Sequence, residues 1–240
     1  PGHSSAASDV YKRQEYVEGE AGYAQYVLSD GTTIRVTATE RVAYIETSFV
    51  DSAGVIYIGS GFNSSKVDDS WIKVLDNKRV SAYAQGGEFC GSPTSYPIYI
   101  AMEFDVPASN CTFWKDDKCV PQRRAKGKNA SLSLAFQEKS VLVRMAISYV
   151  SEAQAWKNLS SSSAGDFHAA RAQNNQAWDA ALRSIEVFGG SNEDHEEFYS
   201  HLYHALIHPN LVSDIDGQYL GGDGKVYQDV NRPHYSSLSL

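Results

Sequence analysis

The chain has 240 residues, of which 42% are hydrophobic and 21% charged, and its formal net charge is −8. This length can bury a sizeable core, and the composition is typical of a globular protein rather than a disordered one. The negative charge disfavours nucleic acid and anionic membranes as partners, because both bind clusters of Lys and Arg. The one basic run, residues 123–128, is interpreted as a solvated loop.

The first half of the chain predicts β-structure. Between Tyr23 and Phe49, apolar and polar residues alternate on both sides of Asp30-Gly31, a dipeptide typical of hairpin turns. Further short strands are expected, separated by turns at the spacing of a β-sandwich. They cover residues 55–58, 71–74, 80–84, 98–104, 132–136 and 140–150.

After Val150 the apolar period changes from that of strands to that of helices. A short helix is expected over residues 151–159. Asp166 should cap a second helix with an apolar stripe over 167–185, and a capping-box pattern at 191–194 should begin a third. Pro209 should end the third helix, because the residue before proline avoids the α region. The sequence therefore predicts a β domain joined to the start of an α domain.

A segment dense in aspartate, glycine and tyrosine follows, SDIDGQYLGGDGKVY at residues 213–227. It is not an EF-hand, because counting from Asp214 places Lys225 at position 12, where a glutamate would bind calcium. Glycine-assisted turns flanking a short hairpin, with aspartates bonded to local backbone, explain the glycines. Asp214, Asp216 and Asp223 could include a glycosidase pair, but their spacing assigns neither an acid nor a base.

Cysteine, histidine and asparagine offer weaker signals. Cys111 and Cys119 could close a disulfide in an oxidising compartment, which would leave Cys90 as a free thiol. Three histidines before Pro209 could bind zinc, but the H-E-x-x-H spacing of zinc proteases is absent. Asn-x-Ser/Thr sequons, which permit a secreted glycoprotein, occur at Asn63, Asn110, Asn129 and Asn158.

The two ends of the chain are interpreted as foreign. DVYKRQ, at residues 9–14, back-translates to the mosaic end of a transposase that is used to prepare sequencing libraries. The reverse complement of the last nine bases of that sequence encodes Leu-Ser-Leu, which is how the chain ends. Residues 1–14 and 238–240 are therefore expected to be adapter-derived, and the chain to be an internal fragment.

The order of motifs resembles glycoside hydrolase family 92. FYSHLYHALIHPNLVSDIDGQYLGGDGKVY, at residues 198–227, is similar to the start of that family's catalytic domain. AGYAQYVLSDGTTIRVTATERVAYIETSFV (residues 21–50), the FCGS turn before YPIYIAMEFD (89–105) and VRMAISYVSEAQAWKNL (143–159) fit in collinear order. The family implies a calcium-dependent, inverting exo-α-mannosidase, commonly specific for α-1,2 linkages. Its active site lies between an N-terminal β-sandwich and an (α/α)6 barrel.

The resemblance implies a β-sandwich over residues 15–150, linker helices over 151–190 and the start of the barrel over 191–237. Mannose-containing glycans are the expected partners, and secretion or a periplasmic location is expected. The catalytic acid, the base and the calcium ligands are expected beyond residue 240, so this piece alone should be inactive. The alternative is a non-catalytic carbohydrate-binding sandwich. Substrate-binding residues are expected at Phe89, Cys90, Gly91, Asp214, Asp216, Tyr219 and Asp223.

Overall fold

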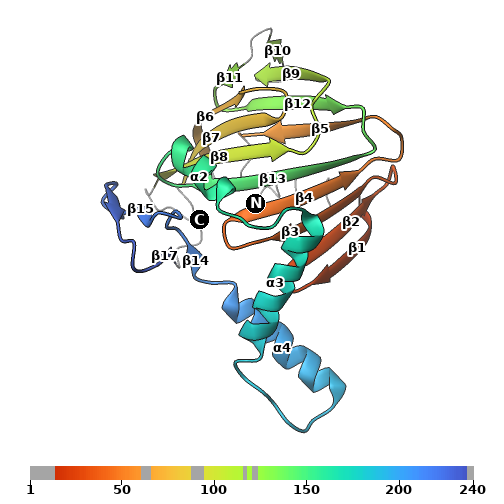
Figure 1. Ribbon diagram of the computed structural model, residues 1–240, viewed down its shortest axis with the longest axis vertical. Coiled ribbons are helices and arrows are strands. Elements are labelled where there is room, and N and C mark those ends of the chain that lie inside the picture. Colours follow the sequence, from red (N-terminus) through yellow and green to blue (C-terminus); the bar gives the residue numbers. More distant parts are fainter. Residues whose placement is uncertain (1–13, 61–65, 88–94, 116–117, 121–123, 237–240) are drawn as a thin grey trace.

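The computed structural model describes residues 14–60, 66–87, 95–115, 118–120 and 124–236. In these stretches two antiparallel sheets come first and three helices follow, with short strands near the C-terminal end (Figure 1). The strands of the two sheets are β1 (Gln14–Glu20), β2 (Tyr23–Leu28), β3 (Thr33–Ala38), β4 (Val42–Ser48), β5 (Gly54–Gly59), β6 (Lys66–Val74), β7 (Arg79–Gly87), β8 (Ser95–Phe104), β9 (Asn110–Lys115), β10 (Lys118–Val120), β11 (Arg124–Lys126), β12 (Ala130–Phe136) and β13 (Ser140–Ser148). After them come α2 (Glu152–Ser160), α3 (Phe167–Leu182), α4 (Asn192–Leu206), β14 (Asn210–Leu211), β15 (Gln218–Leu220), β16 (Val226–Gln228) and β17 (Tyr235–Ser236).

The two sheets form the predicted β-sandwich. The larger sheet has nine strands in the order β1-β2-β3-β4-β13-β8-β7-β6-β11, and the smaller has four in the order β10-β9-β12-β5. The predicted turn joins β2 to β3, where Gly31 takes φ +84°, a conformation that favours glycine. β13 pairs with both β4 and β8, so the last strand before the helices lies in the middle of the larger sheet.

The main core lies between the two sheets. Phe104 of β8 packs against Phe136 of β12 with ring centroids 5.4 Å apart, and each residue is 1% exposed. From Leu132 to Phe136 of β12, buried and half-buried positions alternate, as the period of a strand requires. The buried residues of this core are Phe49, Ile72, Val80, Ala82, Met102, Phe104, Phe113, Ala125, Ala130, Leu132, Leu134, Phe136, Val141 and Val143.

Helices α2 and α3 pack on the other face of the larger sheet. The indole nitrogen of Trp156 in α2 donates a 3.0 Å hydrogen bond to the hydroxyl of Ser81 in β7. Phe167 at the start of α3 packs edge-on against Tyr23 of β2, with centroids 6.4 Å apart. These contacts belong to a second buried cluster, so α2 and the first turns of α3 are fixed to the sandwich.

The third predicted helix, α4, makes few contacts within the described residues, and none of its own residues is buried. Its predicted capping box is present, with Ser191 and Asp194 each bonding the backbone of the other. Trp178 of α3 meets Tyr203 of α4 with centroids 4.6 Å apart. Among the described residues, no helix combines the length and the apolar character needed to cross a membrane.

The predicted strands and helices are confirmed, with two differences. The apolar stripe of the second helix was expected to reach Ile185, but α3 ends at Leu182 and Ile185 is 48% exposed. The alternation pattern also misses β1, β9, β10 and β11. Three of these four, β1, β10 and β11, lie at sheet edges.

The disulfide that Cys111 and Cys119 could form in an oxidising compartment is absent from this structure. β10 pairs with β9 so that Cys119 lies opposite Trp114, three positions along the strand from Cys111. At about 3.3 Å per residue this offset is about 10 Å, whereas a disulfide requires Cα atoms within about 7 Å. Both thiols are free.

The ends that were interpreted as adapter-derived fall almost entirely outside the described residues. Gln14 is the exception, because it is the first residue of β1 and lies opposite Leu28 of β2. The assignment of residues 1–14 and 238–240 to an adapter stays a prediction.

Candidate functional site

The segment 213–229 lies against one end of the larger sheet. At this end β13 finishes at Ser148 and β4 begins directly after Arg41. Nε of Arg41 donates a 3.3 Å hydrogen bond to the backbone oxygen of Ser213. The segment, called the anchored loop below, thus meets the rigid sandwich where strands end, as binding loops commonly do.

The β7–β8 hairpin reaches the same end of the sheet. Its flanking residues Gly87 and Ser95 lie opposite each other. Tyr96, one residue further, packs edge-on against Tyr149 with ring centroids 6.3 Å apart, and Tyr149 directly follows β13. The hairpin turn between these flanks lies outside the described residues, and with it the predicted substrate-binding residues Phe89, Cys90 and Gly91.

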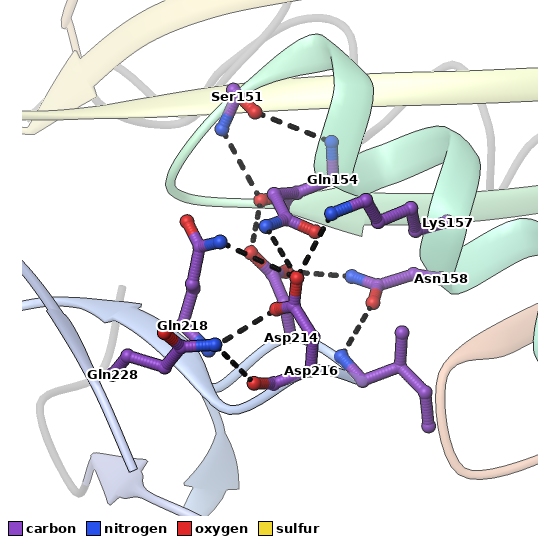
Figure 2. A network of polar contacts seen from close by, with 10 residues as sticks. Ser151, Gln154, Lys157, Asn158, Asp214, Asp216, Gln218 and Gln228 are labelled. Atoms are coloured by element: carbon purple, nitrogen blue, oxygen red, sulfur yellow. Dashed lines mark hydrogen bonds and ion pairs between the residues drawn. The ribbon is translucent and has the colours of Figure 1, made fainter. Parts of the chain in front are cut away.

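Asp214 joins the anchored loop to helix α2, as Figure 2 shows. The residue is 2% exposed. Its Oδ1 accepts a 2.7 Å hydrogen bond from Nδ2 of Asn158, and its Oδ2 accepts one of 2.8 Å from the hydroxyl of Ser148. Oδ1 of Asn158 accepts in turn from the backbone nitrogen of Ile215 at 2.9 Å. Asn158 therefore holds both a side chain and the backbone of the loop.

Burial is the main influence on the charge of Asp214. It raises the pKa of the carboxyl above 3.8, because desolvation disfavours the ionised form, and Asp216 adds to this rise. Hydrogen bonds from Asn158 and Ser148 and the charge of Arg41 act in the opposite direction. A raised carboxyl pKa also suits a general acid. The contacts of Asp214 with protein donors on both oxygens favour a structural role.

Asp216 is the second anchor of the loop to α2 (Figure 2). Its Oδ2 accepts hydrogen bonds of 2.9 Å from Nε2 of Gln154 and of 2.9 Å from Nζ of Lys157. Burial of the Asp216 carboxyl opposes ionisation, but these donors outweigh it and hold the pKa below 3.8. Oε1 of Gln154 is buried and has no hydrogen-bond partner among the described residues.

Local turn chemistry shapes the rest of the anchored loop. Gly217 and Gly224 take φ +82° and +77°, at the two ends of the hairpin β15–β16. Asp223 accepts a 3.1 Å hydrogen bond from the backbone nitrogen of Lys225 and one of 2.8 Å from the hydroxyl of Tyr227. The predicted pair of glycine-assisted turns around a short hairpin is confirmed.

Tyr219 is the centre of a stack of three rings. Its centroid lies 5.8 Å from that of Tyr227 and 3.8 Å from that of His234, with interplanar angles of 27° and 16°. The backbone nitrogen of His234 donates a 3.0 Å hydrogen bond to the hydroxyl of Ser213, and its Nε2 lies 3.5 Å from Oδ2 of Asp229. The stack ties the hairpin to the segment that follows it.

A hollow of about 300 Å³ lies between the end of the sheet and the anchored loop. It is lined by the end of β13, the β3–β4 turn and the start of the anchored loop. The segments that line it are residues 38–43, 145–149 and 211–214, together with Asn158.

The structure thus gathers three of the predicted residues, Asp214, Asp216 and Tyr219, into one folded unit, with Asp223 at its exposed tip. Asp214 and Asp216 contact α2 directly, whereas Tyr219 contacts other parts of the C-terminal segment. Their role in binding substrate stays a prediction, as it does for the residues of the β7–β8 turn.

The partners of the two aspartates on α2 were not predicted. Gln154, Lys157 and Asn158 stand at positions i, i+3 and i+4, which places them on one face of the helix. This polar helix face is visible in the sequence, but the sequence does not show that it contacts Asp214 and Asp216. In the sequence Asn158 is marked only by its sequon, whereas in the structure it is 2% exposed.

Asp214 and Asp216 do not fit the calcium ion that the resemblance implies. Asp214 accepts from two neutral donors and Asp216 accepts from the cationic Lys157, so their oxygens face hydrogen-bond donors rather than an open coordination space. In the part of the chain that the structure describes, no three His, Cys, Asp or Glu side chains converge on a common metal position.

Comparison with protein families covers nearly the whole chain. The glycosyl hydrolase family 92 N-terminal domain matches residues 2–148, and the glycosyl hydrolase family 92 catalytic domain matches residues 154–240. The chain belongs to glycoside hydrolase family 92. The first match begins inside residues 1–14 and the second includes α2 and α3, so the boundaries expected at residues 14 and 190 stay predictions.

Solved structures of family 92 proteins share this fold. The alpha-mannosidase BT3965 from Bacteroides thetaiotaomicron superposes with a TM-score of 0.83 at 22% identity, over 91% of this chain and 31% of that one. The inverting mannosidase BT2199 from the same organism gives 0.81 at 22%, over 92% and 30%. The family 92 glycosyl hydrolase ccman5 gives 0.84 at 19%, over 93% and 32%.

The chain therefore spans about a third of the length of these family 92 structures. BT3965 has also been solved in complex with mannoimidazole. No curated protein sequence matches the chain.

Proposed function

We propose that this chain is part of a longer, inverting exo-α-mannosidase. The observation that carries the proposal is the collinear match to both family 92 domains along one chain. The names of the solved relatives, an alpha-mannosidase and an inverting mannosidase, support the same reaction class. Inversion requires a carboxylic acid that protonates the leaving group and a carboxylate that activates water on the opposite face of the sugar.

We propose that the anchored loop supplies a fixed wall of the substrate cleft rather than the acid or the base. Asp214 and Asp216 accept hydrogen bonds from α2 and β13, which supports a positioning role for both carboxylates. The β7–β8 hairpin and the loop lie at the same end of the larger sheet, which supports a cleft bordered by both. Phe89, Cys90, Gly91, Tyr219 and Asp223 are the proposed sugar-contacting residues of that cleft.

The proposed substrates are mannose-containing glycans, with α-1,2 linkages preferred. We propose an extracytoplasmic location, where such glycans occur. We also propose that calcium assists the reaction and is bound by residues other than those of the anchored loop, because its carboxylates already face hydrogen-bond donors.

The test is an assay of the chain extended by its downstream reading frame. We expect release of mannose from α-1,2-mannobiose, with loss of activity in a calcium chelator. Proton NMR of the first product should show the β-anomer, as inversion requires. The 240-residue chain alone should release no mannose. Absence of mannose release by the extended protein on α-1,2-, α-1,3- and α-1,6-linked substrates would reject the proposal.

The role of the loop is tested separately in the extended protein with Asp216→Ala. A positioning role predicts a higher KM or lower stability and a smaller change in kcat. Loss of all measurable kcat with normal substrate binding would instead identify Asp216 as a catalytic residue.

A further inference from the structure

We propose that N-linked glycosylation of Asn158 and docking of the anchored loop exclude each other. Asn158 lies in the sequon Asn158-Leu159-Ser160, which an oligosaccharyltransferase recognises in an unfolded chain. Sequons that carry glycans lie on the surface. Here the sequon is on helix α2, and both Asn158 and Leu159 are 2% exposed.

Both hydrogens of the Asn158 amide are used in the folded chain. Nδ2 donates to the backbone oxygen of Ile147 at 2.8 Å and to Oδ1 of Asp214 at 2.7 Å. Glycan transfer from a lipid-diphosphate donor joins Nδ2 to C1 of the first sugar and breaks the bond from C1 to the diphosphate oxygen. The diphosphate leaves with the electron pair, and Nδ2 loses one proton. A glycosylated Nδ2 has one hydrogen left, so either Ile147 or Asp214 loses its donor.

The room around Asn158 also indicates that a glycan there and the docked loop exclude each other. The hollow of about 300 Å³ beside Asn158 is far too small for an oligosaccharide of many sugars. Of the two acceptors of Nδ2, the Ile147 oxygen belongs to β13 in the middle of the larger sheet, so the glycan would displace Asp214 and the anchored loop, whose Ile215 backbone nitrogen donates to Oδ1 of Asn158. The loop would then lose its contacts with Asn158, and the buried carboxylate of Asp214 would lose a partner that offsets its desolvation.

The other described sequons are compatible with the fold. Asn110, at the start of β9, and Asn129, just before β12, are both exposed. Their amide nitrogens could carry a glycan without displacing buried groups. This exclusion affects the folding of the chain and does not depend on the proposed mannosidase activity. It favours export by a route that lacks oligosaccharyltransferase, such as a bacterial periplasm, over passage through a eukaryotic secretory pathway.

Ser160 allows a clean test, because it is exposed and its hydroxyl donates to the backbone oxygen of Trp156 in its own helix at 2.9 Å. Ser160→Ala removes the sequon without changing Asn158, and Ser160→Thr strengthens it as an acceptor. Thr112→Ala removes the exposed sequon at Asn110 and is the matched control. The wild-type chain and the three variants are secreted from yeast and are also produced in the bacterial cytoplasm, which has no transferase. Limited proteolysis separates folded from unfolded chains, and mass spectrometry measures glycan occupancy at each site.

We expect glycan on Asn158 only in the protease-sensitive fraction from yeast, whereas glycans on Asn110 and Asn129 should also occur in the resistant fraction. Ser160→Ala should increase the resistant share from yeast and leave the bacterial product unchanged, and Ser160→Thr should reduce the resistant share from yeast. Thr112→Ala should change only the occupancy of Asn110. A resistant chain with glycan on Asn158 would overturn the proposal. An empty Asn158 in every fraction of Ser160→Thr would also overturn it, because the unfolded sequon would then not be an acceptor.

Discussion

Nδ2 of Asn158 lies 2.7 Å from Oδ1 of Asp214, and this hydrogen bond joins residues that are 56 positions apart in the chain. It connects the first helix after the sandwich to the loop that follows the third helix. The same asparagine accepts from the backbone of Ile215 and donates to the backbone of Ile147. One amide side chain therefore holds together β13, α2 and the anchored loop.

Replacing this amide should strongly destabilise the fold. Asn158→Leu keeps a similar volume but removes three hydrogen bonds, with the buried Asp214 carboxylate, the Ile147 oxygen and the Ile215 nitrogen. We expect a loss of about 3 kcal/mol in the free energy of unfolding, measured with urea and tryptophan fluorescence. Ser160→Ala on the same helix should change it by less than about 0.5 kcal/mol. Equal stabilities of the two variants would contradict the role of Asn158.

The buried carboxyl of Asp214 should make stability depend on pH. Its pKa is raised in the folded state, so the folded chain binds the proton more tightly than the unfolded chain does. This contribution to stability is complete below pH 3.8 and is lost as pH rises through the folded-state pKa. Asp214→Asn removes the titration. The free energy of unfolding of the wild type minus that of the variant should therefore decrease with rising pH, and a difference independent of pH would refute this account.

The two partners of Asp216 should differ in importance. Asp216→Ala deprives the amide of Gln154 of its acceptor, and Gln154 is only 3% exposed. We expect a loss of about 1–2 kcal/mol in the free energy of unfolding. Lys157→Met should cost less than about 0.5 kcal/mol, because the lysine side chain is 54% exposed and such ion pairs are weak. Urea titrations of both variants at neutral pH measure the difference, and a larger cost for Lys157→Met would reverse the ranking.

Three glycines of the hairpin allow backbone strain to be separated from collision. A Cβ at Gly217 would lie 2.3 Å from the backbone oxygen of Asp229, and Gly217 also has φ +82°. Gly224 has φ +77°, but a Cβ there would meet open space. A Cβ at Gly222 would also meet open space, and Gly222 does not have the positive φ that favours glycine. We expect Gly217→Ala to destabilise most, Gly224→Ala by about 1 kcal/mol and Gly222→Ala least. Hydrogen exchange of the β15–β16 amides measures this local stability, and equal effects of Gly217→Ala and Gly224→Ala would show that φ alone decides.

Much of the fold could be predicted from the sequence, because the signals are local. The hairpin at Asp30-Gly31, the cap at Asp166 and the capping box at Ser191 each depend on residues a few positions apart. The collinear motifs predicted the family before the fold was known. Edge strands were missed, because pairing with a neighbour stabilises them more than their own pattern does.

In the candidate site, too, local features could be predicted from the sequence and long-range contacts could not. The sequence by itself determined the turns of the anchored loop, since glycine and aspartate act on the backbone beside them. Only the tertiary structure decided that Asp214 is buried against Asn158 and Ser148, and that Asp216 faces Gln154 and Lys157. These contacts span 56 to 66 positions of the chain. They form only because β13 and α2 place their donors at one end of the sheet, and desolvation then makes each hydrogen bond there important for stability.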